Sequence, residues 1–141
     1  MKIKKMILAA VGCFVVSFLI AAIWHLALFK NLYHDLGIFS RKEPLVHLGI
    51  IDNVLKAFVL AYVYPIGYQG GSSVREGLRF GILMGILVGS SWILGMAATQ
   101  PVVSISTWLF LETPFVLLQF GLAGMVIGLI YGKNSSSKRV K

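Results

Sequence analysis

Charged residues are scarce in this sequence. Asp, Glu, Lys and Arg make up 13% of its 141 residues, whereas a soluble domain typically has about 25%. Hydrophobic residues make up 57%, and the mean hydropathy is +0.85. A soluble core of this size cannot bury so much apolar surface. The composition therefore excludes an ordinary soluble domain and predicts an integral membrane protein whose main partner is the lipid bilayer.

Cysteine and catalytic motifs are also nearly absent. Cys13 is the only cysteine, which excludes an internal disulfide and a thiolate metal cluster and leaves the redox compartment undetermined. The glycines of residues 67–71 are not followed by Gly-Lys-Ser/Thr, so they do not form a phosphate-binding loop. The sequence has no nucleophile elbow, paired-histidine zinc helix or Cys-x-x-Cys motif. These absences disfavour an enzyme and leave any cofactor unidentified.

Four apolar runs are long enough to cross a bilayer, which takes roughly 20 residues of helix. They predict helices at about residues 6–29, 45–66, 77–98 and 106–131. Pro44 and Pro65 suit the ends of the second helix, because proline lacks the backbone donor that a helix interior requires. We therefore predict an all-α fold, an integral membrane four-helix bundle that forms a single domain over residues 1–132. The remaining residues, 133–141, read as a basic, disordered tail.

The flanks of these runs refine the prediction. The first run follows three lysines, as a secretory signal does, but its length of about 24 residues exceeds the 7–15 of a signal core, so we predict a retained helix. Residues 30–43 predict a short interfacial helix that uses Leu32, Leu36 and Phe39. His34 and His47 lie in or beside this connection and are expected at the interface. Residues 68–75 are rich in Gly and Ser and predict a flexible turn.

Lysine and arginine are distributed unevenly between the two sides that four crossings define. One side collects Lys2, Lys4, Lys5, Arg75, Arg79, Lys133, Lys138, Arg139 and Lys141. The other side has Lys30, Arg41 and Lys42. The positive-inside rule therefore predicts cytoplasmic N and C termini, in a multi-pass protein of the bacterial cytoplasmic (inner) membrane. Because the net charge of +8 lies at the termini and in short connections, it favours anionic lipid and argues against nucleic acid.

Glycines recur at small-residue spacing in the last two predicted helices. The third helix has Gly77, Gly81, Gly85 and Gly89 at four-residue steps, and the fourth has Gly121, Gly124, Gly128 and Gly132. Such stripes let two helix backbones approach closely, where van der Waals contact replaces the missing hydrophobic drive. We expect these two helices to pack on each other. The alternative is that one stripe contacts a second copy or another protein.

Several ionisable residues are predicted to lie inside the membrane at a similar depth. With a rise of 1.5 Å per residue, His25 lies roughly 6 Å, Glu112 roughly 9 Å and Asp52 roughly 10 Å from the outer boundary. Lys56 lies roughly 16 Å deep, one helical turn after Asp52, with Asn53 beside the pair. Pro114 follows Glu112 and favours a bend there. Charged groups at such depth are costly unless they are paired or hydrated, so they commonly face the bundle interior.

Three interpretations of this polar cluster remain open. A structural network would pair Asp52 with Lys56 and His25 with Glu112, fixing the helix register. A proton or ion pathway would use the same groups. A metal or haem site would take His25, Asp52 and Glu112 as ligands, since one imidazole and two carboxylates match ligand sets used by Zn and non-haem Fe. Trp24, Trp92 and Trp108 fit an outer interfacial belt.

The chain resembles a loosely defined group of small bacterial four-helix membrane proteins of unknown function. The motifs that carry the resemblance are Trp24-His25, Tyr64-Pro65 followed by Gly70-Gly71 and Glu76-Gly77-Leu78-Arg79-Phe80-Gly81, and Trp108 with Glu112. The resemblance covers nearly the whole chain. It implies the four-helix architecture and does not imply a reaction.

Three functions therefore remain open. The leading hypothesis is a non-enzymatic membrane protein that acts through protein contacts, either as an accessory subunit of a larger membrane complex or as a homo-oligomer. The second is a small transporter or proton-handling protein that uses the intramembrane cluster. The third is a membrane metal or haem enzyme. The sequence identifies neither the substrate nor the partner, and it does not determine the oligomeric state.

Overall fold

The computed structural model describes residues 3–38, 43, 45–68 and 72–132, and it is helical. Its elements are α1 (Ile3–Ala22), the π-helical segment η1 (Ile23–Leu28), α2 (Lys30–Asp35), α3 (Val46–Gly67), α4 (Ser73–Thr99) and α5 (Ile105–Gly132). No strand occurs in these described ranges. The prediction of an all-α fold with four long apolar helices is confirmed. The predicted tail, residues 133–141, lies outside the described residues.

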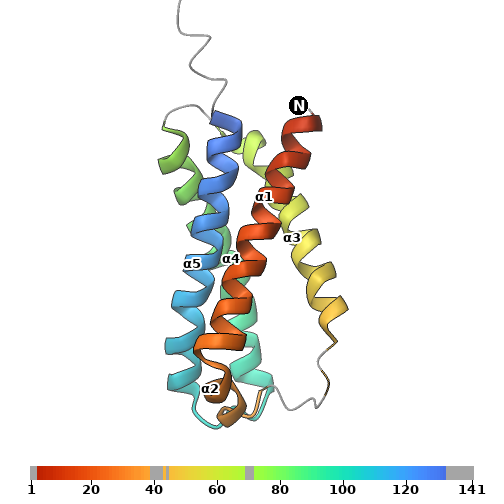
Figure 1. The fold of residues 1–141 in the computed structure, drawn as a ribbon. Helices are drawn as coiled ribbons and strands as arrows, with labels where there is room; N and C mark the ends of the chain where they lie inside the picture. Colours follow the sequence, from red (N-terminus) through yellow and green to blue (C-terminus); the bar gives the residue numbers. More distant parts are fainter. Residues whose placement is uncertain (1–2, 39–42, 44, 69–71, 133–141) are drawn as a thin grey trace, which may run out of the picture.

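Four helical stretches are long and apolar enough to cross a membrane: Ile3–Leu28, Val46–Gly67, Ser73–Thr99 and Ile105–Gly132. The chain therefore has the helix lengths and composition of a multi-pass membrane protein. The long helices alternate in direction, and α1 begins at the end of the bundle where α5 finishes (Figure 1). The helix α4 begins four residues before the predicted start at 77. Its first turns contain the charged residues Arg75, Glu76 and Arg79, so a search for apolar runs misses the start of the helix.

The helix α5 is the centre of the bundle. Half of its most apolar 18-residue window is buried inside the protein, against 22% for each of the other three spans. It packs against α4 on one side and α1 on the other, and α1 packs against α3. The helix α3 is therefore peripheral, which leaves much of its surface uncovered.

The glycines of α4 and α5 lie at the contact between these two helices. Gly77, Gly81, Gly85 and Gly89 are all buried. A Cβ atom added at Gly81 would overlap the Phe120 carbonyl oxygen and lie 3.0 Å from Gly121 Cα. On the facing helix, a Cβ at Gly124 would lie 2.7 Å from Gly81 Cα, and one at Gly128 would lie 2.9 Å from Gly77 Cα. The two backbones are thus close enough that only glycine fits at these positions.

The glycine contact is looser at Gly121 and Gly85 than at the other positions. A Cβ at Gly121 would meet only Leu78 Cδ1, at 3.3 Å, and one at Gly85 would meet Phe120 Cβ at 3.1 Å. A Cβ at Gly89 would lie 2.6 Å from the branched Val116 side chain. The internal α4–α5 contact therefore uses the stripe on both helices.

The helix α2 folds against one end of the bundle. Tyr33 and Leu36 are buried there, 1% and 3% exposed, whereas Leu32 is 37% exposed. Gly37 ends the helix with a φ of 75°, a value that glycine adopts readily. The Leu36 carbonyl then accepts a hydrogen bond from the Val103 backbone N–H at 3.3 Å, which ties α2 to the connection between α4 and α5. The predicted short helix is present, with Leu36 buried and Leu32 partly exposed, and Phe39 lies outside the described residues.

The start of α3 stands apart from the other long helices (Figure 1). Residues 45–52 are all exposed. No atom lies within 4 Å of the position that a Cβ at Gly49 would occupy. The buried residues of α3 begin at Asn53, so its first two turns contain exposed residues only.

Candidate functional site

Glu112 of α5 is the centre of a buried polar cluster. Its side chain is only 1% exposed. The Tyr33 hydroxyl donates a hydrogen bond to Oε1, and Trp92 Nε1 donates to Oε2 at 3.2 Å. Both carboxylate oxygens therefore have a donor, as a charge removed from water requires. The two donors come from α2 and α4, so Glu112 joins three separate elements.

His25 of η1 completes the cluster. Its Nδ1 lies 3.0 Å from the Ala21 carbonyl oxygen, and Nε2 lies 3.6 Å from Glu112 Oε1. Because a carbonyl oxygen only accepts, Nδ1 carries a hydrogen. A second proton on Nε2 would make His25 the cationic partner of the carboxylate. His25 Nε2 and the Glu112 carboxylate thus face each other inside the bundle.

The π-helical segment orients the first-helix residues of the cluster. The Phe29 backbone N–H bonds the Trp24 carbonyl at 3.0 Å, a five-residue step that widens the last turn. Trp24 Nε1 donates to the Tyr33 hydroxyl at 3.2 Å. His25 stacks on the Tyr33 ring, with centroids 4.7 Å apart. The widened turn therefore lets two adjacent residues, Trp24 and His25, both contact Tyr33.

Aromatic rings enclose the polar groups. Phe115 meets His25 edge-on at 4.5 Å and lies 5.7 Å from the Trp24 ring. Trp108 is fully buried and donates from Nε1 to the Ile93 carbonyl at 2.9 Å. The expectation of an outer belt was wrong for Trp108. The indoles of Trp24 and Trp92 point their N–H groups into the cluster, because a buried hydroxyl and carboxylate supply the acceptors that an indole donor needs.

Tyr33 is held as a neutral donor. Burial, together with the hydrogen bond to Glu112, raises the pKa of Tyr33 well above its ordinary value. Both effects act in the same direction because a tyrosinate would lose hydration and face a carboxylate. Tyr33 belongs to α2, outside the four spans. The cluster is therefore closed at this end of the bundle by a hydroxyl that retains its proton.

The other predicted site residues, Asp52, Asn53 and Lys56, lie on α3, whereas Glu112 lies on α5. Lys56 Nζ and Asp52 Oδ2 form an ion pair at 2.6 Å, one helical turn apart, with side chains 33% and 62% exposed. Asn53 is buried, 7% exposed. Adjacent helical positions differ by about 100° around the axis, so Asn53 turns inward where Asp52 turns outward. The predicted depth does not determine this direction, and the structure does not bring Asp52 into the cluster.

The predicted metal ligand set is not assembled. Within the described ranges, no group of three or more His, Cys, Asp or Glu side chains is placed to hold a metal ion. His25 and Glu112 lie together, but Asp52 pairs with Lys56 instead. The exposed His34 lies 3.8 Å from Asp35, and His47 is also exposed.

Sequence reasoning missed Tyr33 as a member of the site. Its signal was the spacing of Tyr33 and Leu36, three residues apart, which places both on one face of a short helix. From the sequence, Leu32 is expected on the buried face of this helix instead, because leucine is more hydrophobic than tyrosine.

No known family model matches the chain, and no curated protein or solved structure is significantly similar to it.

Proposed function

We propose that this chain is a non-enzymatic protein of the bacterial cytoplasmic membrane that acts through protein contacts made by the exposed face of α3. The observation that carries the proposal is the Asp52–Lys56 ion pair, because Asp52 is 62% exposed on a helix apolar enough to span a membrane. Charges that face hydrocarbon cost about 2–3 kcal/mol or more. A second protein surface that covers the pair removes this cost.

The residues around the ion pair support such a contact. Leu48, Ile51 and Leu55 are 53%, 52% and 61% exposed and lie within one turn of it. Apolar side chains surrounding a central charged pair are well suited to a protein partner, since the pair then fixes the register of the contact. Lipid would satisfy only the apolar residues.

The glycine stripes bear on which helix face binds a partner chain. On α4 and α5 they are already used for internal packing. This favours α3 over those faces as the place where another chain binds. The partner is a subunit of a larger membrane complex or a second copy of this chain.

The first test is purification in mild detergent through a tag on the C-terminal end, followed by native mass and identification of every co-purifying chain. A stoichiometric foreign chain identifies an accessory subunit, and a multiple of 15.5 kDa identifies a homo-oligomer. Both support the proposal. A lone, stable monomer contradicts it.

The second test replaces the charged pair by Asp52→Leu with Lys56→Leu. We expect loss of the partner, because the contact then has no charged centre. The matched control is Ser90→Leu with Ser91→Leu, an exposed polar pair on α4 whose hydroxyls both bond the Leu87 carbonyl of their own helix. Partner retention by the α3 variant, or equal loss by both variants, would contradict a specific role of α3.

A second candidate function is proton handling by His25 and Glu112. It is favoured by the neighbouring imidazole and buried carboxylate, 3.6 Å apart, beside the Tyr33 hydroxyl. In proteoliposomes, Glu112→Gln and His25→Gln would each abolish proton flux that the unaltered protein supports. The absence of flux in the unaltered protein, or equal flux in the variants, would exclude this function.

A further inference from the structure

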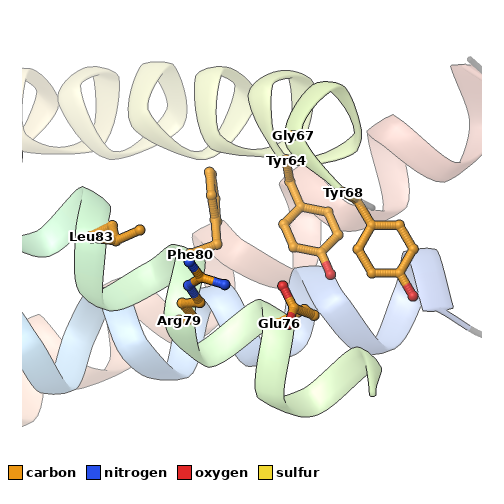
Figure 2. Close-up of a pocket in the computed structure, with 7 residues that line it drawn as sticks. All are labelled: Tyr64, Gly67, Tyr68, Glu76, Arg79, Phe80 and Leu83. Atoms are coloured by element: carbon orange, nitrogen blue, oxygen red, sulfur yellow. The ribbon is translucent and has the colours of Figure 1, made fainter. Parts of the chain in front are cut away.

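A pocket of about 290 Å³ lies between the end of α3 and the start of α4. Tyr64 lines it from α3 and Tyr68 from just after α3, and Glu76, Arg79, Phe80 and Leu83 line it from α4 (Figure 2). The end of α3 and the start of α4 lie at the end of the bundle where α1 begins and α5 finishes (Figure 1). Because two apolar spans end there, this is the level at which lipid headgroups meet the protein.

The pocket changes from charged to apolar along α4. Leu83 follows Glu76 by seven residues, which is about 10 Å along the helix axis. Glu76 and Arg79 lie at the end of the span, while Leu83 lies deeper and is 53% exposed. This gradient suits an amphiphile with its polar part at the helix ends and its chain toward the membrane interior.

The charged residues of the pocket are separated from each other. Glu76 and Arg79 are three positions apart on one helix, yet neither forms an ion pair with any residue that the structure describes. Glu76 is half-buried and Arg79 is exposed. A guanidinium binds phosphate well, and a carboxylate binds an ammonium group. Two separate, opposite charges in one pocket complement a zwitterion.

Aromatic rings form one wall of the pocket. Tyr64 stacks with Tyr68 at 5.5 Å and meets Phe80 edge-on at 5.2 Å. The Tyr131 ring lies 5.7 Å from that of Tyr64, and its hydroxyl donates to the Ala61 carbonyl. Aromatic faces attract ammonium groups.

The Tyr64 hydroxyl has no hydrogen-bond partner. The residue is 2% exposed, and its hydroxyl is the one buried side-chain polar atom without a partner in the described part of the chain. The hydroxyl points toward Glu76 (Figure 2). A buried hydroxyl without a partner is costly, so it marks a place where a ligand can supply the missing bond.

We infer that this pocket binds the headgroup of a zwitterionic aminophospholipid. Arg79 binds the phosphate, Glu76 and the tyrosine rings bind the ammonium group, and the Tyr64 hydroxyl bonds the headgroup. The Glu76 carboxylate disfavours a purely anionic headgroup. The volume lies just below the range of about 300–1,000 Å³ for small-molecule pockets, which suits a headgroup and excludes a large soluble ligand.

The test is native mass spectrometry of the full chain in detergent, titrated with phosphatidylethanolamine or phosphatidylglycerol. We expect phosphatidylethanolamine to bind about tenfold more tightly, the effect of one charge-assisted hydrogen bond. Glu76→Gln should remove this preference. Arg79→Gln should weaken the binding of both lipids about tenfold, because both contain a phosphate. The matched control is Arg75→Gln, which removes an exposed arginine of the same helix that does not line the pocket.

Tyr64→Phe separates lipid binding from fold stability. It retains the ring and removes the unpaired hydroxyl, so phosphatidylethanolamine binding should weaken while the delipidated protein remains as stable as before or gains stability. Equal binding of the two lipids by the unaltered protein would overturn the inference. So would tighter binding of phosphatidylglycerol, or equal weakening by Arg75→Gln and Arg79→Gln.

Discussion

At the residue scale, the fold depends on satisfying one buried carboxylate. Glu112 accepts hydrogen bonds from Tyr33 and Trp92 and faces His25 Nε2. The two donors come from α2 and α4, which are far apart in sequence, and His25 comes from η1, just before α2. Removing any one of them leaves a polar group without a partner in a closed site, which is where single substitutions are most costly.

Glu112→Gln should lower the free energy of unfolding by about 1–3 kcal/mol. The carboxamide has one acceptor oxygen where the carboxylate has two, so its NH₂ group must face either the Tyr33 hydroxyl or the Trp92 indole. Tryptophan fluorescence during denaturation in detergent measures the change. The control is Asp35→Asn, because Asp35 is 76% exposed. Equal effects of the two variants would show that the buried hydrogen bonds contribute nothing specific.

Tyr33 should stay protonated at a pH where an exposed tyrosine ionises. Its folded pKa is raised by burial and by Glu112, so its contribution to stability is complete below the unfolded pKa of about 10 and is lost as the pH rises through the folded value. The tyrosinate absorbance of the folded unaltered protein should therefore match that of Tyr33→Phe at about pH 11. In denaturant, the unaltered protein should show one more ionising tyrosine. An excess in the folded protein would contradict the raised pKa.

At the element scale, α4 and α5 pack closely because the glycines at their contact have no side chains, which lets the two backbones come into van der Waals contact. The close contact runs from Gly77 against Gly124 to Gly89 against Val116. The other special element is η1, whose widened turn places Trp24 and His25 against Tyr33. Both devices work by changing backbone spacing, one between helices and one within a helix.

Gly81→Ala should destabilise the protein by about 1–3 kcal/mol, because the new methyl group would collide with the Phe120 carbonyl. The matched control is Gly95→Ala on the same helix, where a Cβ would have no atom within 4 Å. That variant should be neutral or slightly stabilising, since alanine favours a helix over glycine. Thermal unfolding in detergent compares the two. Equal melting temperatures would contradict the glycine-mediated contact.

At the scale of the whole molecule, four long helices alternate in direction and bring the start of α1 and the end of α5 to one end (Figure 1). The proposed orientation places this end, with the aromatic pocket, in the cytoplasm. The Glu112 cluster and α2 would then lie toward the outer side. The two polar sites would thus face opposite sides of the membrane.

Cysteine labelling in intact cells tests this orientation. In a Cys13→Ala chain, we expect Val103→Cys, at a position that is 77% exposed, to react with a membrane-impermeant maleimide. Ser72→Cys lies at the opposite end of α4 and should react only after the cells are permeabilised. The reverse pattern would show that the termini face outward.

Much of the architecture follows from the sequence itself. The apolar runs predict four long helices, and the glycine steps place Gly77 to Gly89 on one face of α4, because both signals are local and periodic. The depths of His25 and Glu112 likewise follow from counting residues along each helix. These properties depend on positions along one helix and need no knowledge of its neighbours.

Only the tertiary structure decides which polar groups face the bundle interior. Asp52 and Glu112 have similar predicted depths, but the rotation of α3 turns Asp52 outward to Lys56 and Asn53 inward. The buried position of Tyr33 depends on how α2 folds back and on the widened turn of η1. The sequence by itself thus determined the helices and their spacing. Rotation about each axis was decided by packing, because it is set by contacts between residues distant in the chain.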